Sequence, residues 1–187
     1  ITKLPFFKNL TGINDKNGLH RFIFRRDSGI YYGFWWIEFG GQLNTIYDNA
    51  DITLELRKLV YGFWDYIKNS GKFEGVENLE LSHVPSVTGK RESRRFVGDT
   101  ILTQNHIDTK YDFDDAVAIA GWAMDVHAPL GIYDDRPASN WHHVSGSYNI
   151  PFSMMYSKNV SNLMLAGRNM SSTHVAFGSA RVAVTGG

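Results

Sequence analysis

The predicted fold depends most on the segment Asn162-Leu163-Met164-Leu165-Ala166-Gly167-Arg168-Asn169-Met170-Ser171-Ser172-Thr173-His174-Val175-Ala176-Phe177-Gly178-Ser179-Ala180-Arg181-Val182. Its apolar start, residues 163–166, has the length of a strand that is buried on both faces. A small and polar segment follows from Gly167 to Gly178, and the residues from Ser179 onward suit a tightly packed helix. The pattern predicts a strand, a glycine turn and a helix N-terminus, which together can bind an anionic cofactor through backbone N–H groups.

Upstream of this stretch, one segment has a clear helical pattern. Its apolar residues recur every three or four positions and share one face of a helix, which we predict over residues 51–70. These apolar residues are Leu56, Leu59, Val60, Phe63, Trp64 and Ile67. Asp51 can cap the start of the helix and Gly71 its end. A helix of this length with one apolar face has to pack against other elements of the domain.

The remaining segments are short and favour strands and loops. Strands are predicted over residues 21–26, 30–39, 79–84, 95–97 and 116–120, the last of them buried. Residues 99–106 are predicted as a short helix capped by Asp99, residues 128–149 as a long loop or a pair of short strands, and residues 151–156 as extended. The sequence thus predicts an α+β domain with a largely antiparallel sheet and one long helix, followed by a strand that returns to a second domain.

The composition limits the classes of function. Nineteen basic residues balance nineteen acidic ones, so the net charge gives no reason to expect a nucleic acid or an anionic membrane surface as partner. No apolar run approaches the roughly 20 residues that cross a bilayer, and no targeting segment identifies a compartment. The chain has no cysteine, which excludes disulfides, thiolate nucleophiles and a locally held iron–sulfur cluster.

Several motifs follow one another in the second half of the chain. They are Arg91-Glu92-Ser93-Arg94-Arg95-Phe96-Val97-Gly98-Asp99, Asp114-Asp115-Ala116, Trp122-Ala123-Met124-Asp125-Val126-His127, Ile150-Pro151-Phe152, Ala166-Gly167-Arg168, Ser172-Thr173-His174 and Gly178-Ser179-Ala180-Arg181-Val182. In this order they resemble the motifs of FAD-dependent oxidoreductases of the heterodisulfide-reductase-subunit-A-like group, from about residue 85 to the end. The resemblance implies a full-length enzyme that passes a hydride between a small-molecule substrate and FAD.

The resemblance also implies a set of cofactor-binding residues. A helix N-terminus formed by Gly178, Ser179, Ala180, Arg181 and Val182 would face the flavin ring, which carries negative charge when reduced. Gly167, Arg168 and Asn169 would approach the ribityl or pyrophosphate part of FAD.

Three further residues are candidates for the chemical step. His127 and His174 are candidates for proton transfer next to the flavin, because imidazole titrates near neutral pH. Arg95 is the member of its arginine-rich motif that we expect to face the flavin or the substrate.

The glycine fingerprint of a dinucleotide-binding domain, Gly-x-Gly-x-x-Gly, does not occur in the sequence. We therefore expect residues 1–150 to form a substrate-side α+β domain. Residues 151–187 would form a strand, turn and helix that belong to an incomplete Rossmann-like FAD-binding domain, whose other half is missing from this sequence. The isolated chain is then expected to be inactive and to hold no FAD.

Two other classes of function remain open. A small metal-dependent hydrolase could take nitrogen and oxygen ligands from His106, Asp108, Asp125, His127, His142 and His143, although lone histidines are more often structural, so we expect no metal. A carbohydrate-binding module could use the aromatic strand Tyr31-Tyr32-Gly33-Phe34-Trp35-Trp36 as a stacking surface. Aromatic residues on both faces of that strand favour a place inside a core instead.

Overall fold

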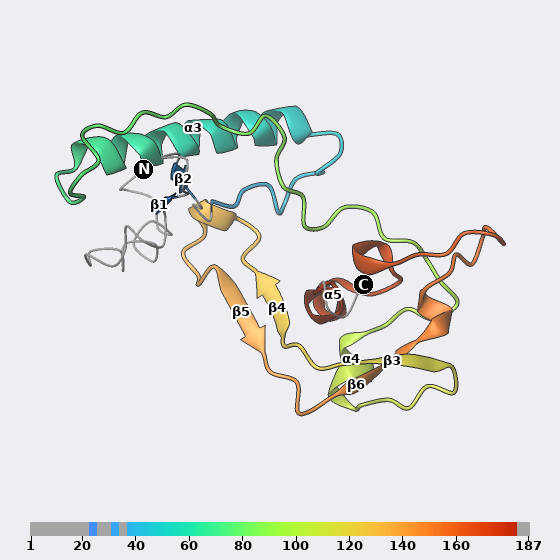
Figure 1. Ribbon diagram of the computed structural model, residues 1–187. Coiled ribbons are helices and arrows are strands. Elements are labelled where there is room, and N and C mark those ends of the chain that lie inside the picture. The colour runs from blue at the N-terminus through green and yellow to red at the C-terminus, as the bar shows by residue number, and fades with distance from the viewer. Residues whose placement is uncertain (1–22, 26–30, 34–36, 183–187) are drawn as a thin grey trace. The chain divides into compact units, whose positions relative to one another are not determined.

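The computed structural model describes the backbone of residues 23–25 and 31–33 and the complete residues 37–182. The chain divides into two compact units, and each is described here by itself (Figure 1). Unit 1 comprises Ile1–Gly89 and Ala128–Ala138, and unit 2 comprises Lys90–His127 and Ser139–Gly187. The predicted division of the protein after residue 150 stays a prediction.

Unit 1 contains a short hairpin within the two predicted strands, although residues 37–39, predicted as the end of the second strand, form no strand. Strand β1 (Ile23–Arg25) pairs in antiparallel register with β2 (Tyr31–Gly33), with Phe24 opposite Tyr32. The other residues of the two predicted strands as far as residue 36 lie outside the described residues. They include the aromatic pair Trp35 and Trp36.

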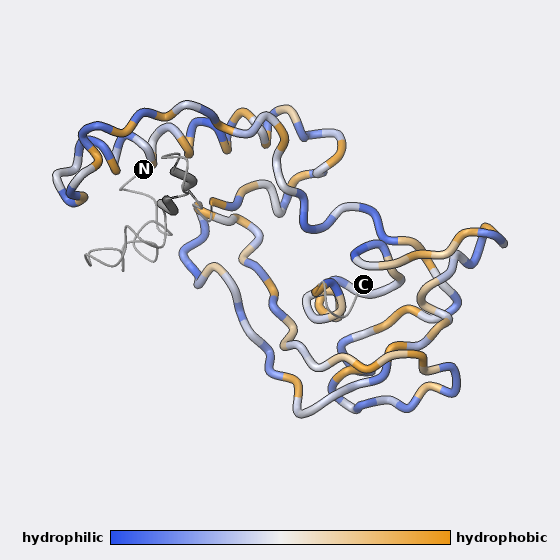
Figure 2. Tube along the Cα trace, in the orientation of Figure 1, coloured by the Kyte–Doolittle hydropathy of each residue, from blue (hydrophilic) through white to orange (hydrophobic). Residues whose placement is uncertain are grey.

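The long helix of unit 1 is α3 (Asn49–Asn69), which matches the predicted range closely. Its N-cap residue is Asp48 rather than Asp51, which lies in the first turn. At the other end Gly71 adopts a left-handed φ of 70°, the conformation in which glycine commonly ends a helix. Hydrophobic and hydrophilic residues alternate along α3 (Figure 2), and Ile52, Leu59, Phe63 and Ile67 are the buried ones. The predicted apolar face is therefore largely the packed face.

The segment after α3 folds back without forming a strand. Lys68 Nζ lies 2.8 Å from the carbonyl oxygens of Val76, Glu77 and Leu79, so one ammonium group satisfies three backbone acceptors of this loop. The predicted strand over residues 79–84 is wrong, because the structure has neither helix nor strand there. Buried in another part of unit 1, Leu59 packs with Ile132 of the 3-10 turn η2 (Gly131–Tyr133).

Unit 2 is built from short helices and strands that are spread along the sequence from residue 104 to residue 180. In order they are α4 (Gln104–Asp108), β3 (Ala116–Ala120), β4 (Met124–His127), β5 (Ser139–His142), β6 (Tyr148–Pro151), η3 (Phe152–Met154), η4 (Gly167–Asn169) and α5 (His174–Ala180). The pairs β3–β6 and β4–β5 are antiparallel. The α+β class with antiparallel pairing is confirmed, and the second of the two alternatives for residues 128–149, short strands, is the one found.

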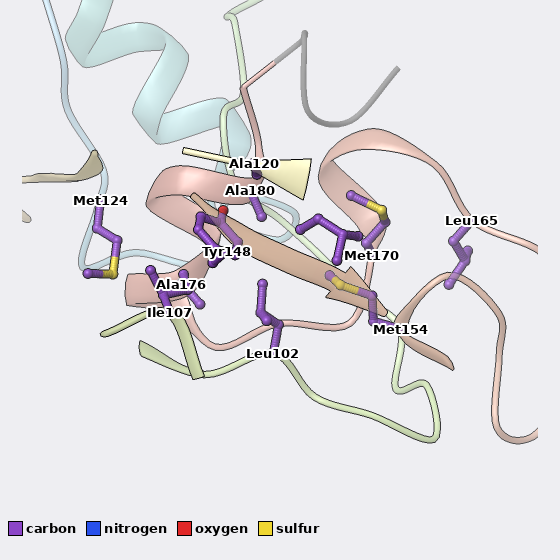
Figure 3. Packing of buried hydrophobic residues seen from close by; sticks show 11 residues of the cluster. Leu102, Ile107, Ala120, Met124, Tyr148, Met154, Leu165, Met170, Ala176 and Ala180 are labelled. Atoms are coloured by element: carbon purple, nitrogen blue, oxygen red, sulfur yellow. The ribbon is translucent and has the colours of Figure 1, made fainter. Parts of the chain in front are cut away.

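One apolar core holds the elements of unit 2 together. Figure 3 shows side chains from α4, β3, β4, β6 and α5 gathered around Tyr148. The most completely buried of them are Leu102, Ile107, Met124, Ile150, Met154 and Ala176. These come from six different segments, so the core fixes the positions of the loops between them.

Three predictions around this core are wrong in place or burial. Residues 95–97 form no strand, and the short helix begins at Gln104 rather than near Asp99 because Thr103 and His106 form its capping box. β3 lies where a buried strand was predicted, but Val117 and Ile119 are 57% and 72% exposed. β3 has a partner, β6, on one edge, and its burial begins only at Ala120.

Residues 162–182 differ from the prediction at both ends of the segment. Residues 163–166 form one isolated bridge, Tyr156 with Met164, and only Leu165 of the four is buried, so the predicted strand is wrong. Residues 151–156 are extended only at their start, because η3 follows Pro151. The final helix begins at His174, after the N-cap Thr173, and not at Ser179. Whether this stretch belongs to a Rossmann-like domain stays a prediction.

Candidate functional site

A basic segment of unit 2, residues 90–96, lies along the turn η4. We call it the arginine segment. Its two ends are held by η4, because Arg168 Nη1 donates to the carbonyl oxygen of Lys90 at 2.7 Å and Phe96 N donates to that of Asn169 at 3.1 Å. The side chains between these anchors reach β4 and α5, so the arginine segment joins three elements of unit 2.

His127 and Asp125 share one face of β4, as residues two apart on a strand do. His127 Nε2 lies 3.0 Å from Asp125 Oδ2. Arg91 Nη1 lies 2.5 Å from Nε2 and 3.1 Å from Nδ1 of the His127 ring. Nε2 therefore has an acceptor and a donor beside it and can bond to only one of them at a time. Where Nε2 carries the proton, it donates to Asp125 and leaves Nδ1 to accept from Arg91.

The same carboxylate also binds Arg181, from the end of α5. Arg181 Nη2 donates to Asp125 Oδ2 at 3.1 Å, and the two side chains are 14% and 11% exposed. Asp125 Oδ2 is therefore within hydrogen-bonding distance of both His127 and Arg181, whereas Asp125 Oδ1 is buried without a hydrogen-bond partner. A buried carboxylate oxygen without a donor is costly, and such atoms are uncommon in folded proteins.

A second carboxylate, Glu92 of the arginine segment, organises the other side of the site. It accepts hydrogen bonds from Arg95 and from Nδ1 of His174, the latter at 2.7 Å. The Arg95 guanidinium lies 5.2 Å from the centre of the Phe177 ring, and Arg181 lies 5.9 Å from the same ring. Phe177 therefore connects the Glu92 side of the site to the Asp125 side.

We call this set of side chains the arginine–histidine cluster; its members are Arg91, Glu92, Arg95, Asp125, His127, His174, Phe177 and Arg181. All three residues predicted for the chemical step, His127, His174 and Arg95, belong to it. The two imidazoles differ in exposure, at 17% for His127 and 59% for His174. The named members of the cluster include three arginines and two carboxylates, which is an excess of one positive charge among them.

The first group of predicted cofactor residues lies in η4 and is open to solvent. Gly167 has a left-handed φ of 66°, which only glycine adopts without strain, and Arg168 and Asn169 are exposed. A turn with exposed backbone and a guanidinium beside it fits the phosphate-bearing part of a dinucleotide. Gly167, Arg168 and Asn169 therefore fit the role that the resemblance implies.

The second group occupies the end of α5 rather than a helix N-terminus, so that part of the prediction is wrong. Gly178, Ser179 and Ala180 are buried, and Arg181 and Val182 follow the helix. A Cβ on Gly178 would lie 2.9 Å from the carbonyl oxygen of Asp125, so glycine is needed here for close packing on β4. Of the five, Arg181 is the one whose side chain reaches the arginine–histidine cluster.

Ser179 links α5 to two aromatic residues. Its Oγ donates to the carbonyl oxygen of Trp122 at 2.6 Å and so accepts from the Tyr148 hydroxyl at 2.7 Å. Burial raises the pKa of Tyr148, which stays a neutral donor near neutral pH. This bonding makes Ser179 a structural residue of unit 2.

The metal alternative finds no ligand set in the described part of the chain. Within residues 37–182, no three histidine, aspartate or glutamate side chains gather closely enough to hold an ion. His106 caps α4, and Asp125 and His127 bind Arg181 and Arg91.

From the sequence, Arg91 and Glu92 were considered only as parts of their arginine-rich motif, in which Arg95 was preferred for a functional role, and Asp125 was considered only within its motif and as a metal ligand. For Asp125 a signal was present, since the spacing Asp125-x-His127 on a strand places both side chains on one face. Glu92 pairs with a histidine 82 positions away, and no local pattern carries that information.

Unit 2 thus brings two imidazoles, three arginines and two carboxylates together near the turn η4. A family model described as FAD dependent oxidoreductase matches residues 4–186, and the chain therefore belongs to this family. The predicted class, an oxidoreductase that uses FAD, is confirmed at that level. Searches among curated proteins and among solved structures found no match. In the part of the chain that the structure describes, no helix combines the length and hydropathy needed to cross a bilayer.

Proposed function

We propose that the arginine–histidine cluster is the substrate side of a flavin site, within the heterodisulfide-reductase-subunit-A-like group of the family. The observation that carries the proposal is the convergence of His127, His174 and Arg95 on two carboxylates, from segments up to 82 residues apart. A purely structural ion pair does not require two imidazoles beside it.

His127 is the proton acceptor in this proposal. When a substrate alcohol is oxidised to a carbonyl, its carbon loses a hydride and its hydroxyl loses a proton, and the proton passes to His127. With Nε2–H donated to Asp125, the lone pair that takes the proton is on Nδ1, where a substrate hydroxyl competes with Arg91. Asp125 acts as a positioning residue that fixes the tautomer, and Arg181 fixes Asp125.

The other members of the cluster surround the substrate and help to bind and orient it. His174 is open to solvent and, with Glu92 behind it, can exchange protons with water. Arg95, stacked on Phe177, presents positive charge to an anionic group of the substrate. FAD, when bound, supplies the acceptor for the hydride.

Gly167, Arg168 and Asn169 would hold part of FAD, and its ADP portion would bind to a segment other than residues 1–187, which contain no Gly-x-Gly-x-x-Gly. We therefore expect the 187-residue chain alone to retain no stoichiometric FAD after equilibrium dialysis. Tight binding of one FAD per chain would contradict this part of the proposal.

The test of function uses FAD-loaded protein that contains this chain together with a dinucleotide-binding part. The protein is mixed without oxygen with a panel of hydroxylated acids and sugars, and the probe is the compound that bleaches the flavin absorbance fastest. His127→Gln should slow this single-turnover reduction about 100-fold or more, the range in which general bases contribute. The matched control is His83→Gln, an exposed histidine of unit 1, which should leave the rate unchanged. Equal rates for His127→Gln and the unmodified protein would refute the proposal.

A further inference from the structure

Asp125 and His127 lie on one face of β4, and residues of the paired strand β5 lie on the same face. In the antiparallel register Asp125 lies opposite Trp141, and His127 lies opposite Ser139. Directly opposite residues of an antiparallel pair point to the same side, with their Cβ atoms about 5 Å apart. Trp141 and Ser139 therefore share a face with Asp125 and His127.

The indole ring of Trp141 contacts that of Trp122, which lies in the segment before β4. The rings of Trp122 and Trp141 have centroids 6.0 Å apart at an angle of 52°, and the residues are 48% and 46% exposed. Trp141 Nε1 donates to Ser139 Oγ at 2.7 Å, which holds its indole toward the position opposite His127. The backbone of Trp122 is fixed in turn by the hydrogen bond from Ser179 to its carbonyl oxygen. The ring of Trp141 is held by a hydrogen bond, the backbone of Trp122 is fixed, and both residues are about half exposed.

We propose that Trp122 and Trp141 form a stacking subsite for the ring of an acidic saccharide, next to His127. The indoles supply flat apolar surface for the ring face of a sugar. Ser139 and His127, on the same face, carry groups that can form hydrogen bonds with ring hydroxyls. The positive excess of the arginine–histidine cluster matches a carboxylate on the sugar.

This inference deepens the proposed function, on which it rests for the role of His127, and it names the substrate class. It differs from the carbohydrate hypothesis for residues 31–36, because the rings involved are on β5 and in the segment before β4 of unit 2. The binding of a saccharide to Trp122 and Trp141 can be measured without flavin, so the two proposals can fail separately.

The experiment titrates the 187-residue chain with methyl glucuronoside and follows tryptophan fluorescence. Saturable quenching is expected, with weaker binding of the neutral methyl glucoside because it lacks the carboxylate. Trp141→Ala and Trp122→Ala should each weaken binding of the acidic sugar about tenfold, and Trp141→Phe, which keeps a ring, should weaken it less. Trp64→Phe in α3 of unit 1 is the matched control and should leave the affinity unchanged.

Two outcomes would overturn the inference. One is the absence of saturable quenching by either sugar, and the other is binding that neither tryptophan-to-alanine change weakens. Circular dichroism of each variant establishes that unit 2 remains folded, and Trp141→Phe gives a readout if the alanine variants do not fold. If saccharide binding fails while His127→Gln still slows flavin reduction, the proposed function stands and the substrate class is wrong.

Discussion

Two aspartates of the described residues, Asp134 of unit 1 and Asp125 of unit 2, have little exposed side-chain surface but differ in how their carboxylate oxygens are bonded. Asp134 of unit 1 is 1% exposed and accepts from Arg136 Nε and Nη2, both at 2.8 Å, and from the backbone N–H groups of Leu130 and Arg136. All its partners lie within four residues. Asp125 of unit 2 binds Arg181, 56 residues away, through one oxygen and leaves the other without a partner. Asp134 therefore has hydrogen-bond partners on both carboxylate oxygens, whereas Asp125 has them on one oxygen only.

The difference separates a structural carboxylate from a candidate functional one. The Arg136 guanidinium holds the pKa of Asp134 well below its usual range, and its backbone bonds close the turn around η2. Asp125 instead joins β4 to the arginine segment through His127 and to α5 through Arg181. Incomplete satisfaction at a junction of distant segments is typical of sites that bind something else.

The largest expected effect comes from the same substitution at the two aspartates. In FAD-loaded protein, Asp125→Asn should slow flavin reduction by the best panel probe roughly 1000-fold, because the amide no longer fixes the imidazole tautomer. The pH dependence of the rate should also shift, which loss of packing alone would not produce. Asp134→Asn should leave the rate per folded molecule unchanged. Similar rates for the two variants would remove the distinction between the aspartates.

A smaller effect, of about 2 kcal/mol on unfolding, is expected for Gly178→Ala. The new Cβ would meet backbone atoms of Asp125 at 2.9 and 3.0 Å, which costs about 3 kcal/mol, whereas alanine gains about 1 kcal/mol in helix propensity. Gly71→Ala in unit 1 has open space around it but a φ of 70°, and should cost about 1 kcal/mol. Denaturant unfolding measures both. A neutral Gly178→Ala would mean that α5 does not pack this closely on β4.

The sequence predicted elements well where the pattern was long and local. The spacing of Leu59, Phe63 and Ile67 gave α3 within two residues at its start, because a single packed face is enough to define a helix. It failed where glycine had a packing role, since Gly178 was taken for the start of a helix and lies near the end of one. Close approach of two backbones leaves no local pattern in a sequence.

For the site, motifs indicated residues but not their geometry. His127, His174 and Arg95 were predicted separately, and the structure places them in one cluster. The pairing of Glu92 with His174 could not be predicted, because the two residues are 82 positions apart and meet only in the tertiary fold. Burial of β3 was overestimated for a related reason: Val117 and Ile119 are apolar, but nothing local specifies what covers a strand.

The loss of stability at low pH gives a further test of the role of Asp134. Since the pKa of Asp134 is lower in the folded state than in the unfolded one, its ion pair stabilises fully above the unfolded value, about 3.9. The contribution is lost as pH falls from that value toward the lower folded pKa. Asp134→Asn should therefore flatten the fall of melting temperature below about pH 4. An unchanged acid limb would show that Asp134 has no special role in unit 1.

The smallest effect is expected at the alkaline end, at Tyr133. Burial and the hydrogen bond to Glu55 raise the pKa of Tyr133 to about 12. A raised folded pKa means that this stabilisation is full below the unfolded value, about 10, and is lost as the pH rises through about 12. The difference in phenolate absorbance between the unmodified chain and Tyr133→Phe measures this titration. Glu55→Gln should move it back toward 10, and a titration already near 10 in the unmodified chain would contradict the account.

The most direct test of the central claim is an experimental structure of the FAD-loaded protein that contains this chain. We predict that the flavin ring faces the arginine–histidine cluster, with His127 and Arg95 across a space of substrate size and Gly167 beside the cofactor's chain. A flavin bound away from His127, with Asp125 and Arg181 still paired in a closed ion network, would contradict the claim.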